Sequence, residues 1–194
     1  MSQLEQYANK SIIDQAGQTG SMGIFAIDDD KIVTSTNMKN GAYTVAAQPT
    51  APCLLSVLAT AVGSADTMGK VTFVGTDENG TAITEEVIPI ADTTVYTTNM
   101  FKSVTSATGS GWTIGEGNDT IKIGVADVVA PTGYYFCAIQ VLADAVAARQ
   151  TDKDVLTAAL SDYTKLPVVM TIPTRITKIA LTSGEAIGFL ARSV

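Results

Sequence analysis

A β-hairpin is the feature of this sequence that most constrains its fold. The segments 71–76 (VTFVGT) and 81–88 (TAITEEVI) are rich in β-branched residues, and Asp77-Glu78-Asn79-Gly80 separates them. Asn79 and Gly80 can adopt the positive φ angles that a tight hairpin turn needs. The sequence therefore predicts two antiparallel strands here, followed by a third strand that ends near Ser106.

Segments of the same character recur along the chain at intervals of roughly ten residues, separated by Gly, Asn, Asp or Pro. The clearest alternation is in 112–126, with Ile121, Ile123 and Val125 on one face and Thr120, Lys122 and Gly124 on the other. Other predicted strands are 23–27, 31–35, 42–47, 53–62, the first half of 134–146, 166–173, 175–183 and 186–191, with Gly184 in the last turn. The pattern predicts a mainly β protein, an antiparallel β-sandwich or barrel-like domain.

Two segments depart from this pattern. Residues 143–165 are rich in Ala, Leu and Asp, and apolar residues at helical spacing behind Asp152 or Asp154 predict one short helix over 152–164. Residues 1–23 mix polar and small residues, which predicts an N-terminal arm. We expect a single β-rich domain over 24–194, with a candidate internal boundary near residue 131, at Pro131-Thr132-Gly133.

Composition excludes several classes of protein. With 46% hydrophobic and 16% charged residues, disorder over the whole length is excluded. The net charge is −7 and the 12 Lys and Arg are scattered, which disfavours nucleic-acid binding. The longest apolar run, 53–62, is too short to span a bilayer, and residues 1–10 lack the basic and apolar regions of an export signal, so we expect none. We expect a soluble protein that does not bind membranes.

The chain has no histidine, which removes His-based triads, His metal sites and imidazole acid–base chemistry. Its two cysteines, Cys53 and Cys137, lie far apart in apolar segments and are expected to be buried free thiols. Two cysteines without a further partner cannot close a zinc site.

Carboxylates are then the remaining general acids and bases. Asp28-Asp29-Asp30 invites a calcium interpretation, but the alternate ligand spacing, the Gly and the distal Glu of a calcium loop are missing. A solvated turn, balanced by Lys31, is the prediction. Glu85 and Glu86 are neighbours on a predicted strand and point to opposite faces, so they cannot act as a pair.

The other polar candidates also have structural interpretations. Four more acidic residues fall in predicted turns: Asp77, Glu78, Glu116 and Asp119. Gly109–Gly117 lacks the sequence context of a phosphate loop. Trp112 could stack on a carbohydrate with Tyr134 and Tyr135, although a lone Trp among strands is more often a core or interface anchor. Tyr134, Tyr135 and Phe136 are interpreted first as packing residues. No catalytic, cofactor-binding or metal-ligating residue is predicted, and we expect no enzyme.

The hairpin and the chain end together resemble a known pattern. GTDENGTAITEEV, followed by FKSVTS, a Gly-rich turn and IKIGV, resembles the β-domain of tailed-bacteriophage virion proteins. The matching residues are Gly75, Thr76, Asp77, Gly80, Ile83, Thr84, Glu85, Phe101, Lys102, Val104, Thr105 and Ser106. The ending RITKIALTSGEAIGFLARSV is similar to the closing strands of such proteins. Counted with the residues between them, these segments cover more than a third of the chain, and no functional residue comes with them.

The resemblance implies a capsid decoration (cement) protein of the virion, made in the host bacterial cytoplasm. Its implied partner is the outer surface of the major capsid protein, and it is commonly a homotrimer; another homo-oligomer is also compatible. Two alternatives remain open: a neck, tail or head-fibre component of the virion, and a carbohydrate-binding β-sandwich module.

Overall fold

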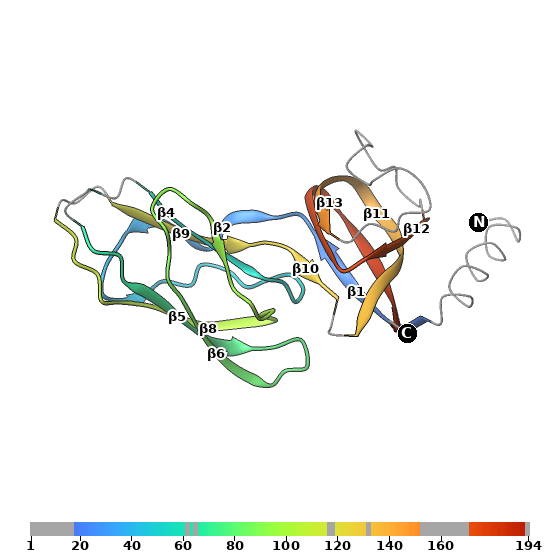
Figure 1. The fold of residues 1–194 in the computed structure, drawn as a ribbon, viewed down its shortest axis with the longest axis horizontal. Coiled ribbons are helices and arrows are strands. Elements are labelled where there is room, and N and C mark those ends of the chain that lie inside the picture. The colour runs from blue at the N-terminus through green and yellow to red at the C-terminus, as the bar shows by residue number, and fades with distance from the viewer. Residues whose placement is uncertain are drawn as a thin grey trace, which may run out of the picture. The chain divides into compact units, whose positions relative to one another are not determined.

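The computed structural model describes residues 18–60, 63, 66–115, 119–130, 133–151 and 171–192, and their regular secondary structure is entirely β (Figure 1). The chain divides into two compact units: Met1–Ile27 with Asp127–Val194 form unit 1, and Asp28–Ala126 form unit 2. Unit 2 is therefore a continuous insertion between the two parts of unit 1. The sequence predicted one domain with a candidate boundary near residue 131, whereas the structure divides the chain after Ile27 and after Ala126.

Unit 2 contains two four-stranded antiparallel sheets in a sandwich-like arrangement (Figure 1). One sheet has the order β2-β9-β4-β7 and the other the order β3-β8-β5-β6. The strands are β2 (Asp28–Asn37), β3 (Gly41–Tyr43), β4 (Leu55–Thr60), β5 (Lys70–Thr76), β6 (Ala82–Val87), β7 (Val95–Tyr96), β8 (Ser103–Ser110) and β9 (Thr120–Val125). The prediction of a mainly β, antiparallel fold is confirmed.

The core of unit 2 follows from alternation along its strands. Ile121 and Ile123 of β9 are fully buried, whereas Thr120 and Lys122 are partly exposed. In the second sheet Phe73 of β5 is fully buried, and its ring lies 6.0 Å from that of Phe101 at an interplanar angle of 61°. This edge-to-face pair is a favourable aromatic geometry.

The predicted hairpin is formed by β5 and β6, with Thr76 opposite Ala82. The Gly80 N–H donates to the Asp77 carbonyl (3.0 Å), and the Asp77 N–H donates to the Thr81 carbonyl (2.9 Å). Gly80 has a φ of +82°, so the connection is a type I turn closed by a glycine bulge. The suggestion that Asn79 also takes a positive φ is wrong, because Asp92 is the only non-glycine with positive φ in the described part of the chain.

At one lateral edge of unit 2 the chain passes from the sheet that contains β2 to the sheet that contains β3, and hydrogen bonds join the two sheets there. A strand is predicted over 42–47, but β3 ends at Tyr43, and the Ala46 N–H then donates to the Ile32 carbonyl on β2 (2.8 Å). Gln48 returns to β8, where its side-chain amide donates to the Val104 carbonyl (3.0 Å) and accepts from the Val104 N–H (2.8 Å). A side chain thus replaces a strand partner at this edge.

Unit 1 is built on two long strands. It contains β1 (Gln18–Phe25), β10 (Val128–Val129), β11 (Tyr134–Thr151), β12 (Thr171–Ile176) and β13 (Lys178–Arg192). The sheet order is β1-β13-β11-β12, and β10 also pairs with β13. The β11–β13 register shifts repeatedly, as between Ala143↔Glu185 and Val146↔Ser183.

Several predictions for unit 1 need correction or remain open. Residues 18–23 of the predicted arm belong to β1, because they pair with β13. The predicted strands 175–183 and 186–191 are joined from Lys178 onward in one continuous strand, β13, and residues 175–176 belong to β12. Gly184 has a φ of +79° within β13 rather than in a turn between two strands. Residues 143–151 lie in β11. The remainder of the arm, 1–17, and the predicted helix, 152–164, lie outside the described residues.

A buried ion pair marks the start of the second part of unit 1. Asp127 is fully buried, and its Oδ2 lies 2.5 Å from Nζ of Lys178, which is partly exposed. The next residue, Val128, is paired with Ile179. The ion pair therefore fixes β10 to the start of β13 by side-chain contact as well as by backbone pairing.

Candidate functional site

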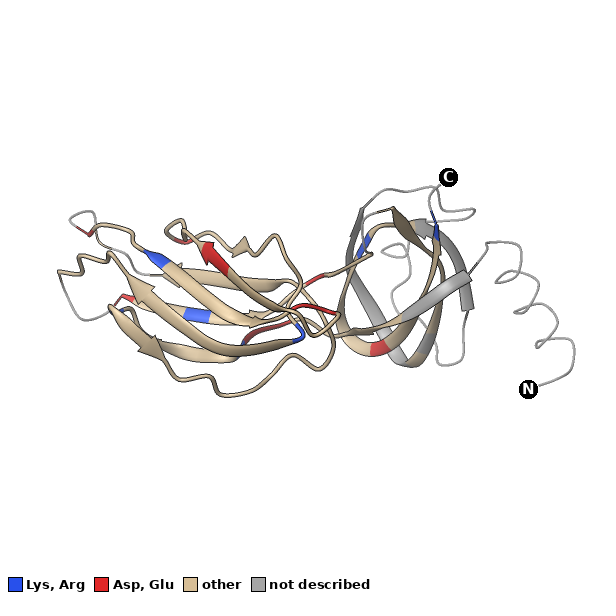
Figure 2. Ribbon diagram, turned by 90° about the horizontal axis from the view of Figure 1, so that it is seen from below, with Lys and Arg blue, Asp and Glu red and all other residues tan. Residues whose placement is uncertain are grey.

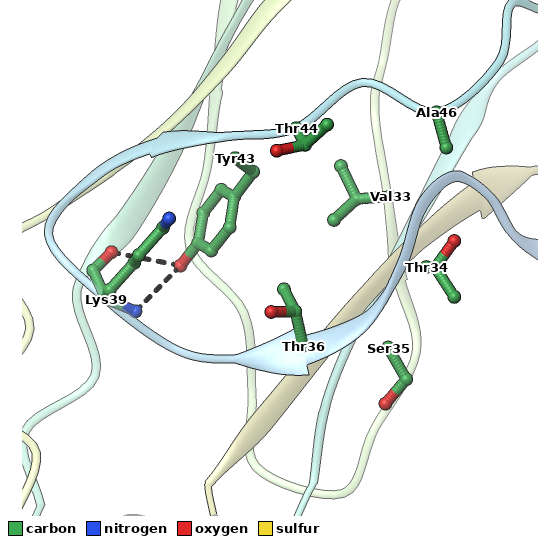
Figure 3. Close-up of a pocket in the computed structure, with 8 residues that line it drawn as sticks. All are labelled: Val33, Thr34, Ser35, Thr36, Lys39, Tyr43, Thr44 and Ala46. Carbon is green, nitrogen blue, oxygen red and sulfur yellow. Dashed lines mark hydrogen bonds between the residues drawn. The ribbon is translucent and has the colours of Figure 1, made fainter.

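An opening of about 330 Å³ lies at the lateral edge of unit 2 where the chain changes sheets. Figure 3 shows Lys39 and Tyr43 at one end and Thr34 and Ala46 at the other. The lining residues are Val33, Thr34, Ser35, Thr36, Lys39, Tyr43, Thr44 and Ala46. The volume falls in the range of small-molecule sites.

The opening exists because β2 separates from the segment that follows β3. The β2–β9 register shifts between Val33 and Thr36, which displaces this part of β2 from regular pairing. At one end the Ala46–Ile32 hydrogen bond closes the gap. At the other end the Tyr43 hydroxyl donates to the Lys39 carbonyl (3.0 Å) and accepts from the Lys39 N–H (3.1 Å).

The chemistry of this opening is that of a polar surface. Burial raises the pKa of the Tyr43 hydroxyl, and Nζ of Lys39 lies 5.8 Å from the centroid of the Tyr43 ring. The remaining polar groups are the hydroxyls of Ser35 and three threonines. No carboxylate or thiol is among the lining residues. The opening can hold water or a small polar group.

The three consecutive aspartates lie at the start of β2, so the predicted turn at Asp28–Asp30 is wrong. β1 and β2 are not a hairpin, because β1 pairs with β13 and β2 with β9. The carboxylate oxygens of the three aspartates lie within 4.8 Å of one another, which makes them a candidate group for a metal ion.

Charge balance at these aspartates comes from Lys122, which forms an ion pair with Asp29. Lys31, the expected partner, instead donates to Oγ1 of Thr50 (2.7 Å). A hydrogen bond with Asp28, partial burial and the neighbouring negative charges raise the pKa of Asp30. In Figure 2 the Lys and Arg residues drawn in blue are scattered over the described part rather than gathered in one patch.

Glu85 and Glu86 have different structural partners. Glu86 forms an exposed ion pair with Lys70 (2.6 Å). Glu85 accepts hydrogen bonds from the Thr98 N–H (2.5 Å) and the Asn99 N–H (3.0 Å), and so fixes the loop between β7 and β8. The carboxylates of Glu85 and Glu86 therefore do not share a binding partner in the structure.

The acidic residues predicted in turns divide into two kinds. Oδ1 of Asp77 accepts from the Asn79 N–H (2.9 Å) and the Thr81 N–H (2.8 Å), as expected of a turn aspartate. Glu78 is partly exposed in the same turn, and Glu116 lies outside the described residues. Asp119 differs, because it is only 2% exposed.

Asp119 lies beside Asp66, a residue that the sequence did not single out. Oδ1 of Asp66 accepts from the Gly115 N–H (2.6 Å) and its Oδ2 accepts from the Gly63 N–H (2.7 Å). The Gly115 N–H is the main reason that the pKa of Asp66 is lowered. Burial, and then the neighbouring Asp66 carboxylate, raise the pKa of Asp119.

The condition for a carbohydrate platform is not met by the aromatic residues. Trp112 is 5% exposed, and its backbone N–H and carbonyl are both bonded to the side chain of Asn40 (3.0 Å each). Tyr134 and Tyr135 are partly exposed on β11, in the other unit, and Phe136 is fully buried.

The remaining predicted features have structural roles. Gly109 lies in β8, opposite both Gly41 and Val71, so this part of Gly109–Gly117 is strand rather than phosphate loop. Cys53 and Cys137 are buried free thiols, as predicted. Burial raises the pKa of the Cys137 thiol, which donates to the Phe189 carbonyl (3.3 Å).

Comparison of the chain with protein-family profiles, curated protein sequences and solved structures finds no match. In the part of the chain that the structure describes, no helix has the length and apolar character needed to cross a membrane.

Proposed function

We propose that this chain is a non-enzymatic structural protein of a tailed bacteriophage, which decorates the capsid and stabilises it by binding the outer surface of the major capsid protein. The observation that carries the proposal is the resemblance of the hairpin, the strand after it and the chain end to virion β-domains. The matching residues have framework roles: Asp77 and Gly80 form the turn, Glu85 fixes a loop, and Phe101 is fully buried.

The chemistry of the described residues also supports a structural protein. Asp77, Glu85 and Glu86 each have a local partner, and the opening beside β2 has no carboxylate in its lining. Enzymes need convergent groups with matched pKa values around a space for substrate. A shell protein needs instead a stable scaffold with a surface for its partner.

A pair of exposed isoleucines is the surface we would test first for capsid contact. Ile88 is 68% and Ile90 is 58% exposed, on either side of the buried Pro89. The following chain is attached to β4, because the Asp92 N–H donates to the Ala59 carbonyl (2.8 Å). Apolar side chains on an attached loop lose little conformational entropy on binding, which favours a contact here.

The binding experiment adds the purified protein to capsids that lack it and measures co-sedimentation. The Ile88→Ser/Ile90→Ser double variant is expected to bind about tenfold or more weakly, because two apolar side chains would no longer be buried. Val74→Thr is the matched control: Val74 is also exposed, at 38%, but lies on β5 within a sheet. Equal weakening by both changes would place the contact elsewhere.

Mass spectrometry of virions purified from the phage that encodes this chain tests the function itself. The protein should be present in many copies per particle, and its absence from the virion would overturn the proposal. Light scattering tests the proposed homotrimer or other homo-oligomer.

A neck, tail or head-fibre component is the alternative within the same setting, because the resemblance applies equally to it. Copy number separates the two, since a decoration protein follows the number of capsomers and a neck or tail component does not. A carbohydrate-binding module has less support because Trp112 is buried.

A further inference from the structure

Asp119 presents a physical problem that the proposed function does not address. The residue is 2% exposed and directly precedes β9, and its Oδ2 has no hydrogen-bond partner among the residues that the structure describes. An ionised carboxylate that is buried without full hydrogen bonding is costly. Some positive charge, a proton or a cation, is therefore needed to account for this position.

The neighbouring Asp66 is well placed to carry a negative charge. It lies between β4 and β5, and its two oxygens accept the Gly115 and Gly63 N–H groups at 2.6 and 2.7 Å. The side chains of Asp66 and Asp119 act on each other, and the Asp66 carboxylate helps to raise the pKa of Asp119. Two carboxyl groups in such contact cannot both ionise cheaply, and they commonly hold one proton between them.

We propose that Asp66 and Asp119 share a single proton, and that this proton fastens the loops at this end of unit 2. The charge rests on Asp66, and Asp119 donates to it. Among the residues that the structure describes, each of these two is the charged group that acts on the other.

The pair connects segments that are distant in sequence. Asp66 joins the 63–66 loop to Gly115, and the next residue, Thr67, exchanges backbone hydrogen bonds with Thr113 (2.9 and 3.2 Å). The Asp119 carbonyl accepts from the Met38 N–H (2.9 Å). Loss of the shared proton would place two negative charges side by side where these loops meet.

The pH dependence has a definite sign. The pKa of Asp119 in the folded protein is raised above its ordinary value of 3.8, so the folded state binds more protons and its stability falls as pH rises through that raised pKa. The pKa of Asp66 is lowered, so its contribution is present above 3.8 and is lost as pH falls through the lowered pKa. The loops should be most firmly held between these two pKa values.

The test is a carboxyl-carbon NMR titration of the full chain, with hydrogen-exchange protection of the Gly63 and Gly115 amides measured in parallel. The Asp119 resonance, identified by its loss in Asp119→Asn, should titrate above the ordinary range, as should that of Asp30, and the Asp66 resonance should titrate below it. Amide protection in the wild type should fall as pH rises through the upper transition. Asp119→Asn, which keeps a donor but cannot ionise, should retain protection there, and Glu78→Gln should behave as the wild type.

Two results would overturn the proposal. In the first, the Asp66 and Asp119 carboxyl groups of the wild type both titrate near their ordinary value, a result that does not depend on how the variants fold. In the second, added calcium chloride restores amide protection at high pH, which would identify the pair as a cation site.

Discussion

The two units of the chain reach stability by different means. Unit 2 consists of short strands, none longer than β2 (Asp28–Asn37), whose ends are held by side chains such as Gln48, Asp77 and Glu85. Unit 1 relies on the long strands β11 and β13, with repeated register shifts and a buried ion pair. Side-chain contacts therefore hold the ends of short strands in unit 2, whereas unit 1 depends more on the backbone pairing of two long strands.

The largest expected effect is in the core of unit 2. Phe73→Ala removes a fully buried ring that packs on Phe101, and should lower the free energy of unfolding by about 3–5 kcal/mol. The measurement is urea unfolding followed by fluorescence of Trp112, the only tryptophan, which lies in unit 2. A loss below about 1 kcal/mol would mean that this core is not closely packed.

The second-largest loss of stability is expected when the buried ion pair of unit 1 is removed. Lys178→Met removes the cation beside the fully buried Asp127, and should cost about 2–4 kcal/mol. Hydrogen exchange of the β10 and β13 amides reports on this unit, and Lys178→Arg, which keeps the charge, is the control. If the methionine variant is as well protected as the arginine variant, the ion pair does not hold β10 to β13.

The turn of the predicted hairpin gives a smaller effect. Gly80→Ala places a side chain at a φ of +82° and should cost about 1–2 kcal/mol. Asn79→Ala is the matched control, because Asn79 does not have a positive φ. Urea unfolding of the two variants separates them, and equal losses would contradict the turn described above.

The smallest effect is expected at the loop held by Glu85. Glu85→Ala removes an acceptor of the Thr98 and Asn99 N–H groups and should cost about 1 kcal/mol. Glu86→Ala removes an exposed ion pair with Lys70 and a long, exposed hydrogen bond from the Thr72 hydroxyl (3.5 Å), and should change stability by about 0.5 kcal/mol or less. Thermal unfolding of both variants shows which substitution destabilises the protein more. A larger loss of stability in Glu86→Ala than in Glu85→Ala would contradict the assigned role of Glu85.

Local sequence patterns predicted unit 2 better than unit 1, for a physical reason. In 120–125 the alternation of apolar and polar residues is itself the code for a half-buried strand, and the hairpin turn depends on neighbours within 77–81. In β13, Gly184 is a turn signal by local rules and has a φ of +79°, but the strand continues through it because Ser183 and Glu185 on either side both pair with β11. Pairing between strands that are distant in sequence overrides the local conformational preference, and a local sequence pattern carries no information about such pairing.

The same limit applies to the candidate sites. The buried thiols and the opposed Glu85 and Glu86 followed from local context. The pairing of Asp66 with Asp119 did not, because each lies in an ordinary turn-like segment and only the fold brings them together. The opening beside β2 was also missed, since it arises where the chain leaves one sheet for the other.

A cryo-electron microscopy reconstruction of the virion of the encoding phage tests the central claim most directly. The proposal predicts density for a β-sandwich-like unit on the outer surface of the capsid, into which the two sheets of unit 2 fit, repeated at equivalent positions around each capsomer. A capsid whose outer surface shows no such density, in a particle preparation that retains all its proteins, would contradict it.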